Sequence, residues 1–279
     1  MNWDKAKNYT IISLIILNVL LLTLNILNLR KNILTNSQKK DITQVLKNNS
    51  IFLNCDIPEK FQPMPSLSMD MYEFDYIKMQ KLFFDDVSKV VRTDNKDEVI
   101  FKQENNQLKL INNSFNYVGA VENASDEKSA KKISDSYVRN ISSAFGSFSL
   151  FNTRRISQDG YCFEYFQKYN VYDIFINKIV VCVYNDKIDI SGTYYKLNEN
   201  NTNVSEIISA DEALFSAMST LSREYTEKAV INNIDLGYYY NNSLNNKTIV
   251  AVPSYRLLMF DNKVFYVNGY SGLVEQAEN

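Results

Sequence analysis

The run Tyr9–Leu29, which reads YTIISLIILNVLLLTLNILNL, decides the architecture of this chain. It contains no charged residue, no proline and no glycine. Because about 20 apolar residues in a helix cross the hydrocarbon core of a bilayer, the run is long enough to span. A cleaved signal peptide has a shorter apolar core and a small-residue cleavage site, whereas this run continues directly into Arg30 and Lys31. We therefore expect a transmembrane helix over residues 9–29, after a short N-terminus at 1–8, with a buried core helix as the alternative.

Three asparagines interrupt the apolar run. Asn18 and Asn25 are seven residues apart, so they share one helix face, to which Leu21 also belongs. A carboxamide that faces lipid is unsatisfied, whereas across a helix–helix interface it can hydrogen-bond to a partner, for about 1 kcal/mol or less. We expect Asn18, Leu21, Asn25 and Asn28 to contact the transmembrane helix of a partner. The alternative is that Asn25 and Asn28 simply reach the interfacial region of the bilayer.

Aromatic and basic residues flank the run on both sides: Trp3, Lys5, Lys7, Arg30 and Lys31. Tryptophan and basic side chains are enriched near the two membrane–water interfaces. We expect these residues to be the membrane-interface anchors of the helix. Because basic residues lie on both sides, the positive-inside rule does not fix the orientation.

Residues 30–279 are polar and contain no second apolar run of spanning length. A stretch of this size is sufficient for one or two compact domains. Apolar residues at helical spacing, with N-cap residues, predict helices over 37–48, 74–91, 125–141 and 209–225. Alternating patterns bounded by turn residues predict strands over 51–53, 98–102, 107–111, 153–157, 161–169, 174–184, 188–195, 234–240, 249–252, 256–260 and 264–268.

A helix followed by antiparallel strands occurs twice in this order, which favours an internal duplication, with two unrelated lobes as the alternative. The predicted fold class is α+β, with an N-terminal transmembrane helix and a two-lobed ectodomain of helices packed on antiparallel sheets. We expect a juxtamembrane helix or linker at 30–49, a first α+β lobe at 50–198 and a second at 199–279.

The cysteines favour a structural role. Cys55, Cys162 and Cys182 are too far apart for a C-x-x-C motif, and their odd number precludes a fully paired framework. Cys162 and Cys182 fall in apolar, strand-like segments, which predicts buried small hydrophobic residues rather than a redox pair. We expect the ectodomain to fold without metal or disulfide.

The composition removes several classes of chemistry. The chain has no histidine, which excludes Ser-His-Asp and Cys-His sites and histidine-ligated metals. Its seven glycines form no phosphate-binding loop, and a net charge of -2 gives no basic face for nucleic acid. The acidic groups Asp85-Asp86 and Asp94, Asp97, Glu98 lack the loop spacing of a calcium site. We expect no catalytic residue, no metal and no cofactor, although a glycosidase-type pair of distant carboxylates stays open.

Four segments resemble the YycI family in the same order along the chain. They are MNWDKAK at 1–7 with the following apolar helix, Asn48–Ile51 with Ile57-Pro58, the strand-rich stretch Tyr161–Tyr195, and Pro253–Glu275, which resembles the PepSY-like final hairpin of that family. Departures from the family pattern are mild and occur at Asp4, Gly269 and Ser271. The second lobe, 199–279, is therefore expected to be PepSY-like, with Tyr255-Arg256 and Tyr266–Gly272 in one structural hairpin.

The resemblance implies regulation rather than catalysis. YycI-like proteins are membrane-anchored companions of the WalK (YycG) sensor histidine kinase in Gram-positive bacteria, a system that governs cell-wall metabolism. Together with YycH they contact the kinase, partly through transmembrane helices, with the N-terminus in the cytoplasm and the α+β domains outside. The expected partners are therefore a WalK-like kinase, a YycH-like protein and the membrane, while a homodimer stays open. The alternatives are a tethered PepSY-like module that binds an envelope protease or peptide, and a tethered cell-wall hydrolase.

Overall fold

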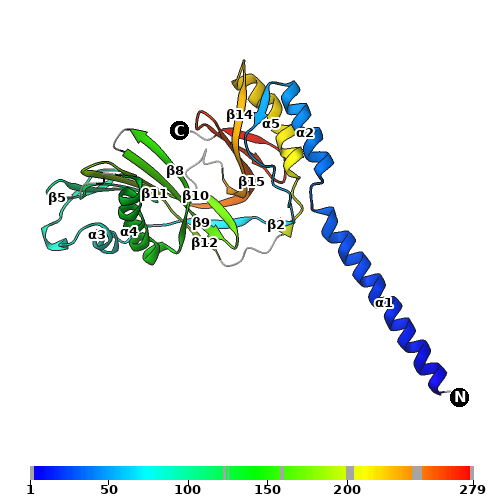
Figure 1. The fold of residues 1–279 in the computed structure, drawn as a ribbon. Coiled ribbons are helices and arrows are strands. Elements are labelled where there is room, and N and C mark those ends of the chain that lie inside the picture. The colour runs from blue at the N-terminus through cyan, green and yellow to red at the C-terminus, as the bar shows by residue number, and fades with distance from the viewer. Residues whose placement is uncertain are drawn as a thin grey trace. The chain divides into compact units, whose positions relative to one another are not determined.

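The computed structural model describes residues 3–121, 124, 126–157, 160–198, 204–240 and 247–276, without the side chains of 4–6, 25–31, 157 and 276. Helices combine with mostly antiparallel strands, so the fold class is α+β, as predicted (Figure 1). The helices are α1 Trp3–Lys31, α2 Asn36–Asn48, α3 Tyr76–Phe83, α4 Glu127–Phe145 and α5 Ala210–Glu224, with a short 3-10 helix at Val87–Lys89.

The strands are β1 Ile51–Leu53, β2 Met64–Pro65, β3 Leu67–Met71, β4 Val91–Asp94, β5 Val99–Gln103, β6 Asn106–Ile111, β7 Ser114–Ala120, β8 Phe148–Ser157, β9 Gly160–Tyr169, β10 Tyr172–Val183, β11 Lys187–Thr193, β12 Tyr195–Leu197, β13 Val204–Ser205, β14 Ala229–Tyr239, β15 Thr248–Met259, β16 Val264–Asn268 and β17 Val274–Gln276. The predicted strand ranges correspond to β1, β5, β6, β8, β9, β10, β11, β14, β15 and β16, whereas β2, β3, β4, β7, β12, β13 and β17 were not predicted. The two strands predicted at 249–252 and 256–260 form the single strand β15. Pro253 does not break it, because the fixed φ of proline suits extended chain and only an N–H donor is lost.

The chain forms two compact units that are discontinuous in sequence. Unit 1 comprises Met1–Met64, Ser205–Asp235 and Tyr255–Asn279, and unit 2 comprises Pro65–Val204 and Leu236–Ser254. This differs from the consecutive lobes 50–198 and 199–279 that the sequence suggested. The physical reason is long-range pairing: β1 runs parallel to the start of β14 within unit 1, which joins segments far apart in the chain.

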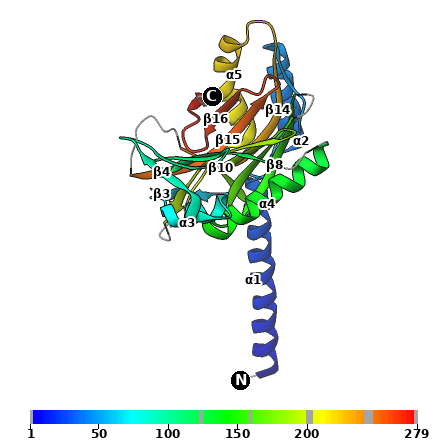
Figure 2. The same ribbon diagram turned by 90° about the vertical axis from the view of Figure 1, so that its left-hand side faces the viewer.

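Unit 2 is built on an antiparallel sheet with the strand order β8-β9-β10-β11-β7-β6-β5-β4. Helix α4 packs on β9 and β10 (Figure 2). It buries Ala130 and Ile141 from the predicted apolar stripe, together with Val138 and Phe145. Its N-cap is Asp126, whereas the predicted cap Ser125 lies outside the described residues. The alternating strands and the amphipathic helix thus close one hydrophobic core.

The helix predicted at 74–91 is shorter than expected, because α3 ends at Phe83 and Phe84 is extended. Phe83 and Phe84 are both buried, and successive residues of a helix do not lie on one face. Extended chain at Phe84 lets both rings enter the core. Asp86 then caps the 3-10 turn by accepting the N–H of Ser88 at 3.1 Å.

Unit 1 packs α2 against α5 and β1, and packs α5 also against β16 and β17. Leu46, Leu214 and Leu221 are fully buried in this arrangement. The predicted start of α5 is confirmed: the backbone N–H of Ser209 donates to the Glu212 carboxylate at 3.0 Å. The predicted hairpin is confirmed for Tyr255-Arg256 in β15 and residues 266–268 in β16, which pairs with β15, whereas residues 269–272 lie in the turn between β16 and β17.

Cys162 and Cys182 form a disulfide between β9 and β10, so the expectation of a domain without one is wrong. The two residues are direct cross-strand partners. Their pairing arises from an irregularity in β10: residues 175–177 are extra between the pairs Gln167–Ile174 and Phe166–Lys178. Without that shift, Cys162 would face Ile179. The inserted Asn177 is buried and exchanges two hydrogen bonds with the backbone of Tyr195, of 2.7 and 2.8 Å.

We expect removal of this disulfide to lower the free energy of unfolding. The bond closes a loop with a sequence separation of 20, for which loop-closure entropy gives a contribution of about 3 kcal/mol. Urea denaturation of the full-length chain in micelles, followed by circular dichroism, should therefore show a lower midpoint for C162A/C182A. The matched control is Cys55→Ser, which leaves the pair intact. Equal midpoints for C162A/C182A and the wild type would contradict the stabilising role.

Candidate functional site

Helix α1 presents an apolar surface to its surroundings. It is the one helix among the described residues that is long and apolar enough to cross a membrane. Its most apolar stretch, Lys7–Leu24, is not buried by the rest of the chain. Its 29 residues correspond to about 44 Å of helix, more than the ~30 Å hydrocarbon core. The helix extends beyond the predicted span 9–29, so Trp3 lies in its first turn.

The predicted contact face can be followed only in part. Asn18 and Leu21 are exposed on α1. Thr23 satisfies its hydroxyl by donating to the carbonyl of Val19 at 2.8 Å, whereas the described residues provide no hydrogen bond to the Asn18 carboxamide. Asn25 and Asn28 belong to α1, but their side chains lie outside the described part. The partner-contact face therefore remains a prediction.

The predicted interface anchors are also only partly described. Trp3 is 72% exposed and Lys7 is exposed. The side chains of Lys5, Arg30 and Lys31 lie outside the described part of the chain. The positions of Trp3 and Lys7 in the first turns of α1 are those at which interfacial side chains occur in membrane helices.

Sequence reasoning missed the junction between α1 and α2, which is the connector 32–35. The N–H of Leu34 donates to the carbonyl of Glu59 at 2.8 Å, and the N–H of Phe61 donates to the carbonyl of Asn32 at 3.2 Å. Ile33 and Lys60 form an antiparallel bridge between these bonds. The connector is thereby held like a strand against residues 59–61, and Leu34 is buried.

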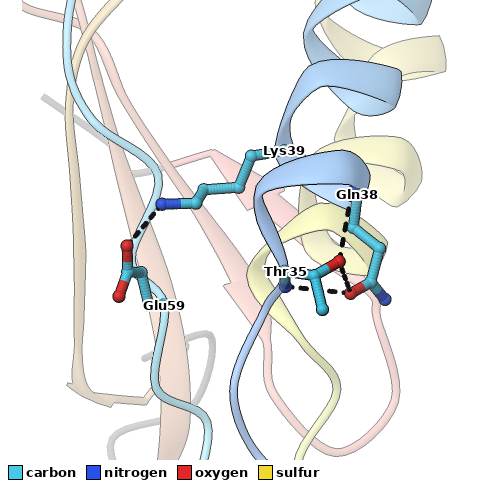
Figure 3. Close-up of polar contacts among 4 residues, drawn as sticks. All are labelled: Thr35, Gln38, Lys39 and Glu59. Carbon is cyan, nitrogen blue, oxygen red and sulfur yellow. Dashed lines mark hydrogen bonds and ion pairs between the residues drawn. The ribbon is translucent and has the colours of Figure 1, made fainter.

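Side chains reinforce this junction at the first turn of α2 (Figure 3). Thr35 and Gln38 form a capping box: the hydroxyl of Thr35 accepts the Gln38 N–H at 3.3 Å, and the Gln38 side-chain oxygen accepts the Thr35 N–H at 3.0 Å. The Lys39 ammonium donates to the Glu59 carboxylate at 2.5 Å. This hydrogen bond, and then the positive charge of Lys39, lower the pKa of Glu59.

The connector between α1 and α2 is short and is held by hydrogen bonds. The four connector residues span at most about 14 Å and are hydrogen-bonded at both ends, whereas a free polar linker behaves as a flexible coil. No signal in the local sequence could have revealed this, because Glu59 follows the polar, proline-containing stretch that reads only as irregular chain.

The acidic groups noted in the sequence serve local structure. Asp86 caps the 3-10 turn, Asp94 pairs with Arg92 at 2.7 Å, and Glu98 pairs with Lys109. Within the described residues there is no group of three or more His, Cys, Asp or Glu that could hold a metal ion.

These features define an α+β protein with one N-terminal apolar helix that is compatible with a single-pass membrane anchor. The chain belongs to the YycI family, because the family model described as "YycI protein" matches residues 30–270.

Comparison with solved structures gives distant likenesses. A crystal structure of an uncharacterized protein from Eubacterium rectale ATCC 33656 matches with a TM-score of 0.52 at 12% identity, over 82% of this chain and 91% of that one. The Bacillus megaterium YpeB C-terminal domain matches with a TM-score of 0.38 at 10% identity, over 75% of this chain and 100% of that one. The first likeness supports the fold alone. No curated protein gives a match.

We expect Thr35→Ala to destabilise the start of α2. Loss of a threonine N-cap costs about 1 kcal/mol, and here it also removes half of the capping box at the junction. Urea denaturation of the full-length chain in micelles should show the loss. Thr43→Ala is the matched control on the same helix, since the Thr43 hydroxyl only donates back to the Lys39 carbonyl and alanine favours helix. An unchanged midpoint for Thr35→Ala would mean that the cap does not hold the junction.

Proposed function

We propose that this chain is a single-pass accessory protein that regulates a sensor histidine kinase of a two-component system controlling cell-wall metabolism. The observation that carries the proposal is the YycI family match over residues 30–270, joined to an exposed apolar helix that precedes it. The partners are a WalK-like (YycG-like) kinase and a YycH-like protein. The protein is a regulator and not an enzyme.

The orientation places residues 1–8 in the cytoplasm and the chain from Lys39 onward, including all of unit 2, outside the membrane. The Cys162–Cys182 disulfide supports this orientation, because disulfides persist in oxidising compartments and are rare in the cytosol. Large domains translocate regardless of a local excess of basic residues, so Arg30 and Lys31 do not oppose it.

The regulation acts through helix contacts and through unit 1. The face that carries Asn18, Leu21, Asn25 and Asn28 packs beside a transmembrane helix of the kinase. Such a contact shifts the kinase equilibrium only by its difference in affinity for the two kinase states. A ligand or YycH-like protein bound to the ectodomain changes the same equilibrium, because the hydrogen-bonded connector 32–35 joins α1 to α2.

The double variant N18L/N25L tests the proposal. Leucine keeps the helix and raises its hydrophobicity, so insertion should persist while kinase binding weakens. Two carboxamides at about 1 kcal/mol each or less correspond to a loss of affinity of up to about thirtyfold. The measurement is the amount of kinase that co-purifies with the full-length protein from membranes, together with the phosphorylation output of the system.

Thr23→Leu is the matched control. It also replaces a polar residue of α1 with leucine. Thr23 lies five residues after Asn18 and two residues before Asn25, and neither spacing places two residues on the same face of a helix. It should retain the kinase as the wild type does. Equal retention by N18L/N25L and Thr23→Leu would refute the polar-face mechanism and leave the ectodomain as the contact.

A further inference from the structure

A groove lies between α2 and α5 in unit 1, with a volume of about 490 Å³. Its residues follow helical spacing on both helices, so each helix contributes one continuous stripe. The stripe of α2 is Gln38, Asp41, Ile42 and Val45, and the stripe of α5 is Asp211, Glu212, Phe215 and Ser216.

The floor of the groove is apolar and partly uncovered. Ile42 is buried between the helices, whereas Val45 is 37% exposed and Phe215 is 59% exposed. Burial of apolar surface is favourable in proportion to the area removed from water. An aromatic side chain held on a rigid helix beside a hollow is therefore a suitable contact for an apolar side chain of another molecule.

The rim of the groove is acidic. Asp41, Asp211 and Glu212 line it, and no lysine or arginine does. Asp211 and Glu212 are held in place at the start of α5, where they accept hydrogen bonds from Ser209. Lys39 is directed to Glu59 instead (Figure 3). The groove thus complements a segment that carries both an apolar side chain and a Lys or Arg.

The place of the groove in the chain restricts the occupant further. Gln38, Asp41 and Ile42 lie in the first half of α2, whereas Val45 lies in its second half, and the α5 residues all lie in the first half of α5. Helix α2 starts after the four-residue connector that follows α1. Since four residues span at most about 14 Å, the groove begins close to the end of the membrane helix. Lys and Arg side chains near the end of a transmembrane helix reach the membrane surface beside the apolar residues of that helix.

We propose that this groove binds the extracytoplasmic juxtamembrane segment of the partner kinase as a helix laid in the groove. An apolar side chain of that segment packs on Phe215 and Val45, and a Lys or Arg of the segment faces Asp41. The choice of partner rests on the proposed function. Together with α1, the groove gives the protein two contacts on one partner, on either side of a short, fixed connector.

Photocrosslinking of the full-length protein in native membranes tests the inference. Benzoylphenylalanine replaces Phe215 in cells that also produce the kinase, and the control carries it at the exposed Ile77 of unit 2. We expect a kinase adduct from position 215 that exceeds that from position 77 by about tenfold. Adducts at position 215 only with lipid, only with a second copy of this chain, or equal to those at position 77 would overturn the inference.

Two variants give an independent readout by kinase co-purification. Phe215→Glu and Asp41→Lys should each reduce the retained kinase about fivefold or more, at an unchanged urea midpoint. Gln44→Lys is the matched control, because Gln44 is exposed on α2 but does not line the groove. Failure of the wild type to retain kinase would refute the proposed function itself. If the wild type and both groove variants retained equal amounts of kinase, binding at the groove would be refuted while the proposed function would stand.

Discussion

Two backbone hydrogen bonds, from Leu34 to Glu59 and from Phe61 to Asn32, fix the point at which α1 meets the rest of unit 1. An apolar helix of this length is compatible with a membrane span, in which its side chains are removed from water. The position of its end therefore sets where the rest of the protein begins. The Thr35 cap then starts α2 within the same connector, and α2 supports α5 and β1. A regulator that acts through helix contacts needs such a joint, since a flexible linker would absorb the displacement.

Sequence patterns within one segment predicted the helices and strands, because these depend on which residues of that segment are buried. The length and composition of Tyr9–Leu29 predicted α1, helical spacing predicted α2, α4 and α5, and alternation predicted β9 and β10 almost to the residue. Pairing partners were not predictable in this way. The parallel pairing of β1 with β14 leaves no periodic signal, and neither does the three-residue irregularity in β10 that brings Cys182 opposite Cys162. The expectation of a disulfide-free domain failed for this reason, and the two units are interleaved along the chain rather than consecutive.

The same difference between local and long-range contacts decides which parts of the candidate site could be predicted. The asparagines of α1 could be assigned to one helix face from their spacing alone, because a helix fixes the direction of each residue. The connector contact with residues 59–61 and the groove between α2 and α5 could not, since each joins segments that are distant in sequence. The sequence places Phe215 in an amphipathic helix. It does not show that α2 lies beside that helix, and the groove with its acidic rim exists only where the two helices are neighbours.

The proposed regulation requires the chain from Lys39 onward to lie outside the membrane, so topology is its most direct test. A membrane-impermeant maleimide applied to intact cells, in a Cys55→Ser background, reports the side on which an introduced cysteine lies. The account predicts labelling of Gln44→Cys on intact cells, and labelling of Asn2→Cys only after the cells are lysed. Labelling of Asn2→Cys on intact cells, with Gln44→Cys protected until lysis, would contradict it.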